Sequence, residues 1–178
     1  MLQVLGVAYP AIIVKNMQES MEFYQRLGLL PLYMEPNRDD PESVVALLAT
    51  VDGSSFVQLV GPTHAGVTIA EATPGVGSMQ YLAFHVSKAQ MDGMFHEMSN
   101  SGVHGSEEIV RGYERLVFLE DPNGVLVTLV AWAVEPPPGM PRAAVLARAT
   151  EIRDAEGAPF VEESHLRAAI ASFQTAQQ

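Results

Sequence analysis

An internal repeat, spaced by 72 residues, constrains the fold of this 178-residue chain more than any other feature. Residues 11–14 (AIIV) and residues 83–86 (AFHV) both have the apolar character of a short strand. Each segment is followed by a polar helix start and an amphipathic helix pattern, which ends at Gly28 in the first case and at Gly102 in the second. The sequence therefore predicts two copies of one unit.

Short strands are expected after each of these helices. They are residues 30–34, 44–50 and 56–60 in the first copy, and residues 115–120 and 125–131 in the second, with a fainter strand between residues 105 and 111. Turn residues at 51–55 and at 121–124 give two hairpin signals. Each copy therefore reads as strand, helix and three strands, and the chain as two tandem βαβββ modules.

The predicted modules divide the chain into four parts. Residues 1–62 form the first module, residues 63–78 a linker rich in Gly, Pro and Thr, residues 79–135 the second module, and residues 136–178 a C-terminal helical extension. Two helices are expected in the extension, at 141–155 and 162–173. Their apolar faces are too small to form a core alone, so they must pack on the modules or on a second subunit.

The composition excludes several classes of function. The chain has 10 Lys and Arg residues against 21 Asp and Glu residues, a formal net charge of −11, which opposes binding to nucleic acid or to an anionic membrane surface. It has no cysteine, and thus no disulfide, thiolate metal site or thiol nucleophile. No signal-peptide pattern or membrane-spanning apolar run is apparent, so a cytoplasmic location is expected.

Two local motifs in this framework point to a known family. They are Phe23-Tyr24 followed by Leu27-Gly28 at the end of the first helix, and the turn Asp121-Pro122-Asn123-Gly124. With the two modules, they resemble the vicinal oxygen chelate superfamily, also called the glyoxalase/bleomycin resistance/dioxygenase superfamily, over roughly residues 5–134. The resemblance implies an α+β fold in which both modules form a curved mixed sheet around one cleft, followed here by the helical extension.

Metal-dependent members of this superfamily hold a divalent ion with four side chains, usually His or Glu, on the first and last strands of each module. The resemblance places these positions at Tyr9, Gln58, Tyr81 and Thr128. A phenol with a pKa near 10, a neutral amide and a hydroxyl are poor substitutes for imidazole and carboxylate ligands. The sequence therefore predicts a member without the usual metal site, and no cofactor is expected.

Every second residue of a strand lies on the same face, so alternation predicts which residues form the cleft wall if the first-strand positions face the cleft. The wall is mostly apolar, with a few polar groups, which suits an apolar or aromatic small molecule. The predicted ligand-binding residues are Tyr9, Ala11, Phe56, Gln58, Tyr81, Ala83, His85, Arg115, Leu126 and Thr128.

Three residues on this wall are candidates for catalysis. Tyr9 and Tyr81 have phenols that could donate a proton to a developing oxyanion, and His85 has a pKa suited to a general base. The alternative for the tyrosines is closure of a filled core with their hydroxyls at its rim. The alternative for His85 is a hydrogen-bonded side chain at a strand end, since no carboxylate partner stands at a fixed spacing from it.

The leading hypothesis is a metal-independent small-molecule-binding protein, used either for sequestration or for acid–base chemistry by Tyr and His. The alternative is a metal-dependent lyase, isomerase or ring-cleaving dioxygenase with a displaced metal site. A third hypothesis is a partner-binding module whose helical extension embraces a second copy, and a homodimer is the expected assembly. The cleft is expected either within one chain or between swapped modules.

Overall fold

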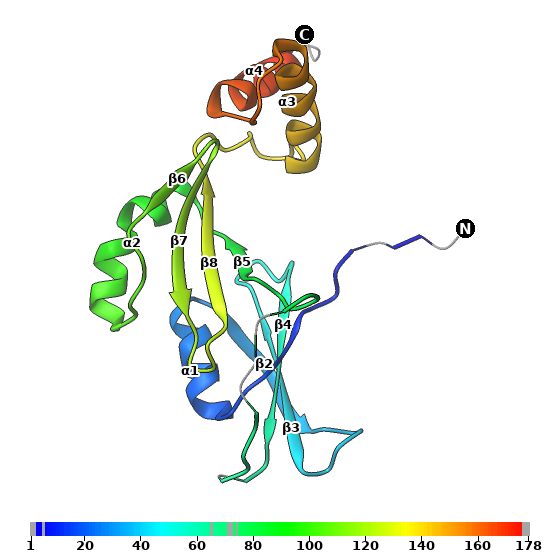
Figure 1. The fold of residues 1–178 in the computed structure, drawn as a ribbon, viewed down its shortest axis with the longest axis vertical. Coiled ribbons are helices and arrows are strands. Elements are labelled where there is room, and N and C mark those ends of the chain that lie inside the picture. The colour runs from blue at the N-terminus through cyan, green and yellow to red at the C-terminus, as the bar shows by residue number, and fades with distance from the viewer. Residues whose placement is uncertain (1–2, 5, 65, 71–72, 74, 176–178) are drawn as a thin grey trace. The chain divides into compact units, whose positions relative to one another are not determined.

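The computed structural model describes residues 3–4, 6–64, 66–70, 73 and 75–175. The first repeat consists of β1 (Ala11–Ile13), α1 (Met17–Arg26), β2 (Leu30–Pro36), β3 (Ser43–Ala49) and β4 (Phe56–Pro62). The second consists of β5 (Leu82–His85), α2 (Lys88–Ser101), β6 (Ile109–Arg111), β7 (Glu114–Glu120) and β8 (Leu126–Trp132). The extension forms α3 (Arg142–Glu156) and α4 (Glu163–Thr175). The predicted α+β fold is therefore confirmed (Figure 1).

Both repeats form a four-stranded mixed sheet with the same topology. The strand order is β1-β4-β3-β2 in the first sheet and β5-β8-β7-β6 in the second. In each sheet the first strand of the repeat runs parallel to the last, while β2, β3 and β4 are antiparallel neighbours. A parallel pair needs a long crossover connection, which the helix of each repeat supplies.

The helix ends follow the signals in the sequence. Asn16 caps α1, where its side-chain oxygen accepts a hydrogen bond from the Glu19 N–H at 3.3 Å. Ser87 and Gln90 form a reciprocal capping box at the start of α2. Gly102 ends α2 with φ of 68°, a left-handed conformation that favours glycine.

The chain divides into two compact units, and the division does not follow the sequence order alone. One unit is Met1–Gln80 with Glu120–Leu126, and the other is Tyr81–Leu119 with Val127–Gln178. The turn between β7 and β8 is therefore part of the first compact unit, although the two strands that it joins are part of the second sheet. In the described part of the chain, no helix is long and apolar enough to cross a membrane.

Asp121 secures that turn within the first unit. The residue is 3% exposed, and its side chain accepts hydrogen bonds from the backbone N–H groups of Asn123 and Val125, both at 2.8 Å. The buried Tyr24 hydroxyl of α1 donates to its other oxygen at 3.1 Å. Burial, followed by the negative charge of Asp121, raises the pKa of Tyr24 above its ordinary value, so the phenol stays protonated as a donor.

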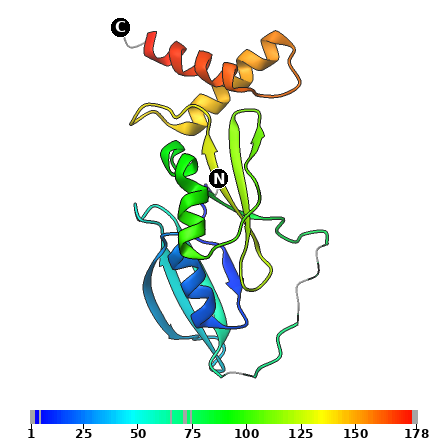
Figure 2. The same cartoon turned by 90° about the vertical axis from the view of Figure 1, so that its left-hand side faces the viewer.

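The C-terminal helices complete the core of the second unit. Their apolar faces pack on each other and on the end of the second module. The core residues are Trp132, Val145, Ala149, Leu166, Ala169 and Ile170. Trp132 comes from β8, so the extension packs on the strand that precedes it as well as on itself. Figures 1 and 2 both show α3 and α4 side by side beyond the end of β8.

Replacing Asp121 by Ala should strongly destabilise the first unit. The substitution leaves two turn N–H groups and the buried Tyr24 hydroxyl without their acceptor, at an expected cost of about 2–4 kcal/mol. The measurement is the free energy of unfolding from urea denaturation. Asp39→Ala, on the exposed β2–β3 loop, is the matched control and should change it by less than about 0.5 kcal/mol. Equal stabilities for the two variants would contradict the role of Asp121.

Candidate functional site

Strand register brings the predicted first-strand and last-strand positions of the first module together. Ala11 on β1 is paired with Gln58 on β4, and the Gln58 N–H donates to the Pro10 carbonyl at 3.0 Å. Leu47 lies on the other side of Gln58, and Tyr33 lies beside Leu47, which completes a row across the sheet. Gln58 therefore stands in the interior of the sheet, with Tyr9 just before the start of β1.

The two faces of this first sheet differ in burial. Ile12, Val14, Val57 and Leu59 are buried, and they alternate along β1 and β4 with exposed or half-buried residues. The face that carries Gln58, together with the adjoining residue Tyr9, is called the Gln58 face below. Its exposed large side chains include Ile13 (67%), Tyr9 (46%) and Tyr33 (43%).

The second sheet repeats this arrangement. Ala83 on β5 is paired with Thr128 on β8, and His85 with Val130. Ala83 is the repeat partner of Ala11, so Thr128 occupies the position that Gln58 has in the first sheet. The face that carries Thr128, with Tyr81, Ala83 and His85, is called the Thr128 face below. Tyr81 is 41% exposed, and its ring meets Phe118 edge-to-face, with 6.2 Å between centroids.

Thr128 differs from Gln58 in burial. The residue is 1% exposed, and its hydroxyl oxygen is buried without a hydrogen bond to any described residue. A hydroxyl removed from water without a partner lowers stability, so this position is not optimised for packing.

His85 lies at the end of β5 with one side against an aromatic ring. Its imidazole meets Trp132 edge-to-face, with 6.2 Å between centroids. Burial, and then the positive charge of Arg142, lowers the pKa of His85 below its ordinary value, although a hydrogen bond with the Val130 backbone and the charge of Glu135 act in the opposite direction. The imidazole is therefore held in its neutral form near pH 7, the form that can accept a proton.

The other predicted residues of the second module are placed differently. Arg115 is engaged by two carboxylates: its guanidinium donates to both oxygens of Glu108 and to Asp92 of α2. These bonds raise its own pKa and direct it toward the helix side of the sheet. Leu126 is 36% exposed and begins β8 within the first compact unit. Ligand binding by the predicted residues stays a prediction.

The donor set at the four predicted metal positions, Tyr9, Gln58, Tyr81 and Thr128, does not fit a divalent ion. Two phenols, an amide and a buried hydroxyl offer neither imidazole nitrogen nor carboxylate oxygen. Within the described ranges, no group of three or more His, Asp or Glu side chains could hold a metal ion at another place.

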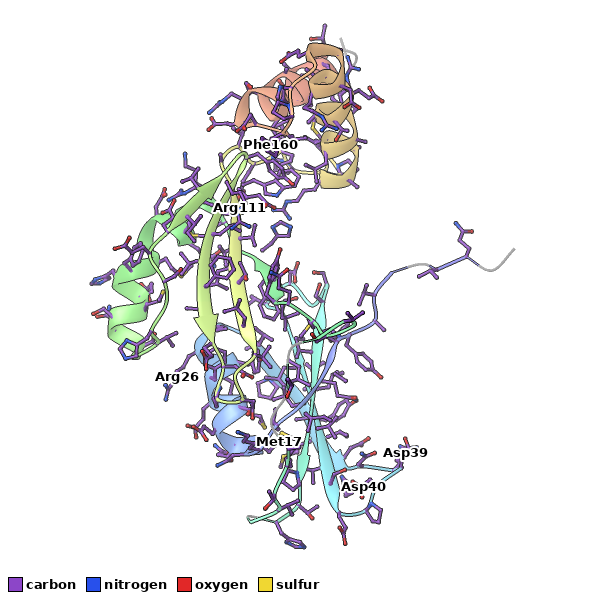
Figure 3. The ribbon with its side chains drawn as sticks, viewed as in Figure 1. Met17, Arg26, Asp39, Asp40, Arg111 and Phe160 are labelled. Carbon is purple, nitrogen blue, oxygen red and sulfur yellow. The ribbon has the colours of Figure 1, made fainter. Side chains whose placement is uncertain are left out.

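A separate cavity, with a volume of about 490 Å³, lies in the second unit. It is lined by residues 111–114 of the β6–β7 hairpin, by Arg153 of α3, and by residues 159–162 of the loop between α3 and α4. Figure 3 shows Arg111 and Phe160 close together at this hairpin. No local signal in the sequence indicated that Arg153 and Phe160 would lie beside this hairpin.

A family model for the Glyoxalase/Bleomycin resistance protein/Dioxygenase superfamily matches residues 6–129. Among solved structures, a glyoxylase/bleomycin resistance protein/dioxygenase domain from Frankia sp. EAN1pec has a TM-score of 0.59 and 14% identity, covering 78% of this chain and 96% of that one. The fosfomycin resistance protein FosX from Listeria monocytogenes has a TM-score of 0.56 and 17% identity, covering 73% and 95%. These identities show the fold alone. No curated protein matches this sequence.

Replacing Thr128 by Val should stabilise the second unit. Val has nearly the same shape and removes a buried hydroxyl that has no partner among the described residues, so the free energy of unfolding should rise by about 1 kcal/mol. Urea denaturation measures the change. Thr150→Val is the control, because the Thr150 hydroxyl donates to the Leu146 carbonyl at 2.8 Å and its loss brings no gain. A destabilised Thr128→Val variant would show that the hydroxyl is satisfied in the folded protein.

Proposed function

We propose that this chain, which belongs to the glyoxalase/bleomycin resistance protein/dioxygenase superfamily, binds a largely apolar or aromatic small molecule without a metal ion. The binding surfaces in this proposal are the Gln58 face and the Thr128 face. The observation that carries it is the exposure of the Gln58 face. Tyr9, Ile13 and Tyr33 are all more than 40% exposed on this face, and exposed apolar surface is typical of ligand-binding sites.

Polar groups on these faces would orient the ligand. Gln58 offers an amide donor and acceptor in the interior of an apolar surface, and Tyr9 offers a phenol two residues before Ala11, the strand partner of Gln58. Small-molecule sites usually have an apolar wall that carries a few polar groups. Arg115 is not part of this proposal, because two carboxylates already bind its guanidinium.

The proposal includes two uses of the bound molecule, sequestration and proton transfer. For proton transfer, His85 is the base, because its neutral imidazole lies at a strand end on the Thr128 face. Tyr9 and Tyr81 are the phenols that would donate to a developing negative charge. Turnover of the bound molecule that is lost in His85→Gln would distinguish catalysis from sequestration. Homodimer formation and a cytoplasmic location stay predictions.

The side chains at the four predicted metal positions argue against the alternative, a metal-dependent enzyme. A FosX variant of the same fold, 17% identical, was solved with Mn(II) and 1S,2S-dihydroxypropylphosphonic acid, so metal-binding proteins occur among the structural neighbours. At its four predicted ligand positions this chain carries two phenols, an amide and a hydroxyl (Tyr9, Tyr81, Gln58 and Thr128) in place of imidazole or carboxylate groups.

Metal content should therefore be at background. The chain would be purified without chelator or affinity tag, exposed in turn to iron(II), nickel, zinc and manganese, and measured by elemental mass spectrometry. We expect less than about 0.1 ion per chain, because neutral oxygen donors do not compensate the charge of the ion. One tightly bound ion per chain that is lost in Gln58→Ala would contradict metal independence.

Binding of a neutral aromatic dye, Nile red, tests the Gln58 face directly. The dye should bind with increased fluorescence, and Gln58→Lys should weaken binding by at least about tenfold, because it places a charge among apolar side chains. Phe95→Ala is the matched control: Phe95 is 50% exposed on α2, outside both faces, and its loss should leave the affinity unchanged. Circular dichroism would verify that each variant is folded. Equal affinity in Gln58→Lys and the wild type would place the dye elsewhere and contradict the proposal.

A further inference from the structure

Three exposed residues of the Thr128 face form a row along β5, from an aromatic side chain to a strand end. Tyr81, Ala83 and His85 are every second residue of this segment, so they share one face, and all three are exposed. Tyr81 and His85 are four residues apart, which is about 13 Å along an extended strand. The row therefore has the length of a small organic molecule with two different ends.

The C-terminal extension brings a cation to the His85 end of this row. Arg142 is the first residue of α3, and its guanidinium lies 5.6 Å from the centre of the Trp132 ring. The His85 imidazole meets the same ring edge-to-face, and the charge of Arg142 acts on it. The superfamily match ends at residue 129, so this cation comes from a part of the chain beyond the match.

Arg142 is held in place while its hydrogen-bond donors are left free. Its contact with the buried Trp132 ring is a cation–π interaction, which fixes the position of the guanidinium. The residue is exposed and forms no side-chain hydrogen bond or ion pair with any described residue. By contrast, Arg115 and Arg153 of the same unit both bind carboxylates. A guanidinium with free donors is a good partner for a carboxylate, which it binds through two parallel hydrogen bonds.

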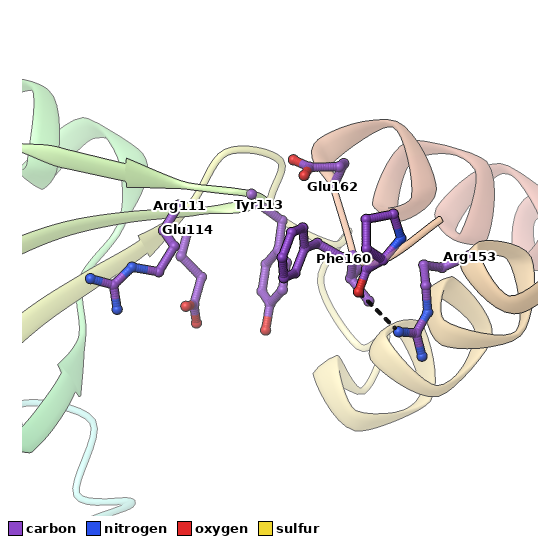
Figure 4. A pocket seen from close by; sticks show the side chains of 9 residues that line it. Arg111, Tyr113, Glu114, Arg153, Phe160 and Glu162 are labelled. Carbon is purple, nitrogen blue, oxygen red and sulfur yellow. Dashed lines mark hydrogen bonds between the residues drawn. The ribbon is translucent and has the colours of Figure 1, made fainter. Parts of the chain in front are cut away.

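Two carboxylates in the neighbouring segments have other partners. Glu135 accepts the Lys88 N–H at 3.0 Å, at the positive end of the α2 dipole. Glu114 is the cross-strand neighbour of Arg111, whose charge acts on it, and Figure 4 shows the two side chains side by side on the β6–β7 hairpin. Arg142 is therefore a cation for which the described residues supply no carboxylate. An acidic group on a ligand meets a local positive charge here, although the whole chain carries −11.

We propose that this row, with Arg142 at its end, binds an aromatic carboxylate. The carboxylate lies on the Arg142 guanidinium, and the aromatic body extends over Ala83 toward Tyr81. Ala83 has only a methyl side chain and leaves room for the body, and the Tyr81 ring is 41% exposed for an aromatic contact. The inference rests on the proposed function, because it uses the Thr128 face, and it names the class of ligand that this face takes.

Three probes of similar size separate the charge from the aromatic body. They are 3-phenylpropionate, the neutral 3-phenylpropanol and the cationic 3-phenylpropylamine, each added to the full chain. Trp132 is the single tryptophan and lies under Arg142, so its fluorescence reports on this end of the row. We expect saturable binding of the carboxylate with a Kd at or below about 1 mM, and at least about tenfold weaker binding of the alcohol and the amine. Isothermal titration calorimetry gives a second readout that does not depend on Trp132.

Matched variants locate the bound carboxylate. Arg142→Gln should weaken binding of 3-phenylpropionate by about tenfold and leave the weak binding of the alcohol unchanged, because only the charged pair is lost. Arg148→Gln removes an exposed arginine of the same helix, one that pairs with Glu151, and should not alter either affinity. Circular dichroism would verify that both variants are folded.

Failure of this inference differs from failure of the proposed function. Equal affinity for the carboxylate and the alcohol, tighter binding of the amine, or full affinity for the carboxylate in Arg142→Gln would overturn the inference. Binding of Nile red without binding of 3-phenylpropionate would also overturn it, while small-molecule binding by the chain would stand. Absence of binding for Nile red and for all three probes would overturn both.

Discussion

The parallel pairing of the first strand with the last strand of each repeat is the constraint on which the structure depends. It brings Ala11 beside Gln58 and Ala83 beside Thr128, pairs that are far apart in sequence, and it requires the helical crossover that α1 and α2 provide. The same pairing makes β4 and β8 interior strands. A polar group that is buried on these strands must then find its hydrogen-bond partner within the protein, in a bound water or in a ligand.

Because the strand pairing involves the backbone, the fold does not depend on which side chains stand at the site. The strand pairs can form with any residues that suit a sheet, so the superfamily fold persists where the predicted ligand positions carry Tyr, Gln and Thr. At the Gln58 position an amide is tolerated because the face is partly exposed. At the Thr128 position the same location in the repeat is buried, and the hydroxyl has no partner in the described part of the chain. The two repeats are alike in backbone and unlike in the environment of their side chains.

The sequence predicted the fold well because its signals were local and occurred twice. The 72-residue spacing from Ala11 to Ala83 corresponds to equivalent strands, and the capping residues Asn16 and Ser87 begin both helices. The direction of Arg115 could not be predicted in this way. Leu116 and Val117 are both buried, so apolar alternation does not tell which face of β7 meets α2. The cavity was also beyond reach, because it depends on the approach of Gly112 to Val161, residues with no local sequence relation.

The C-terminal extension connects packing with binding in the second unit. Trp132 ends β8, and α3 and α4 enclose it in their core, so the helices are part of the folded unit rather than an appendage. The Arg142 guanidinium lies 5.6 Å from the centre of its ring, while Tyr113 packs on the ring from the hairpin. One side chain therefore fixes both the helices and the hairpin that bound the cavity. Because the Arg142 guanidinium is held on this shared core, an acidic ligand group would meet a cation that is already in place.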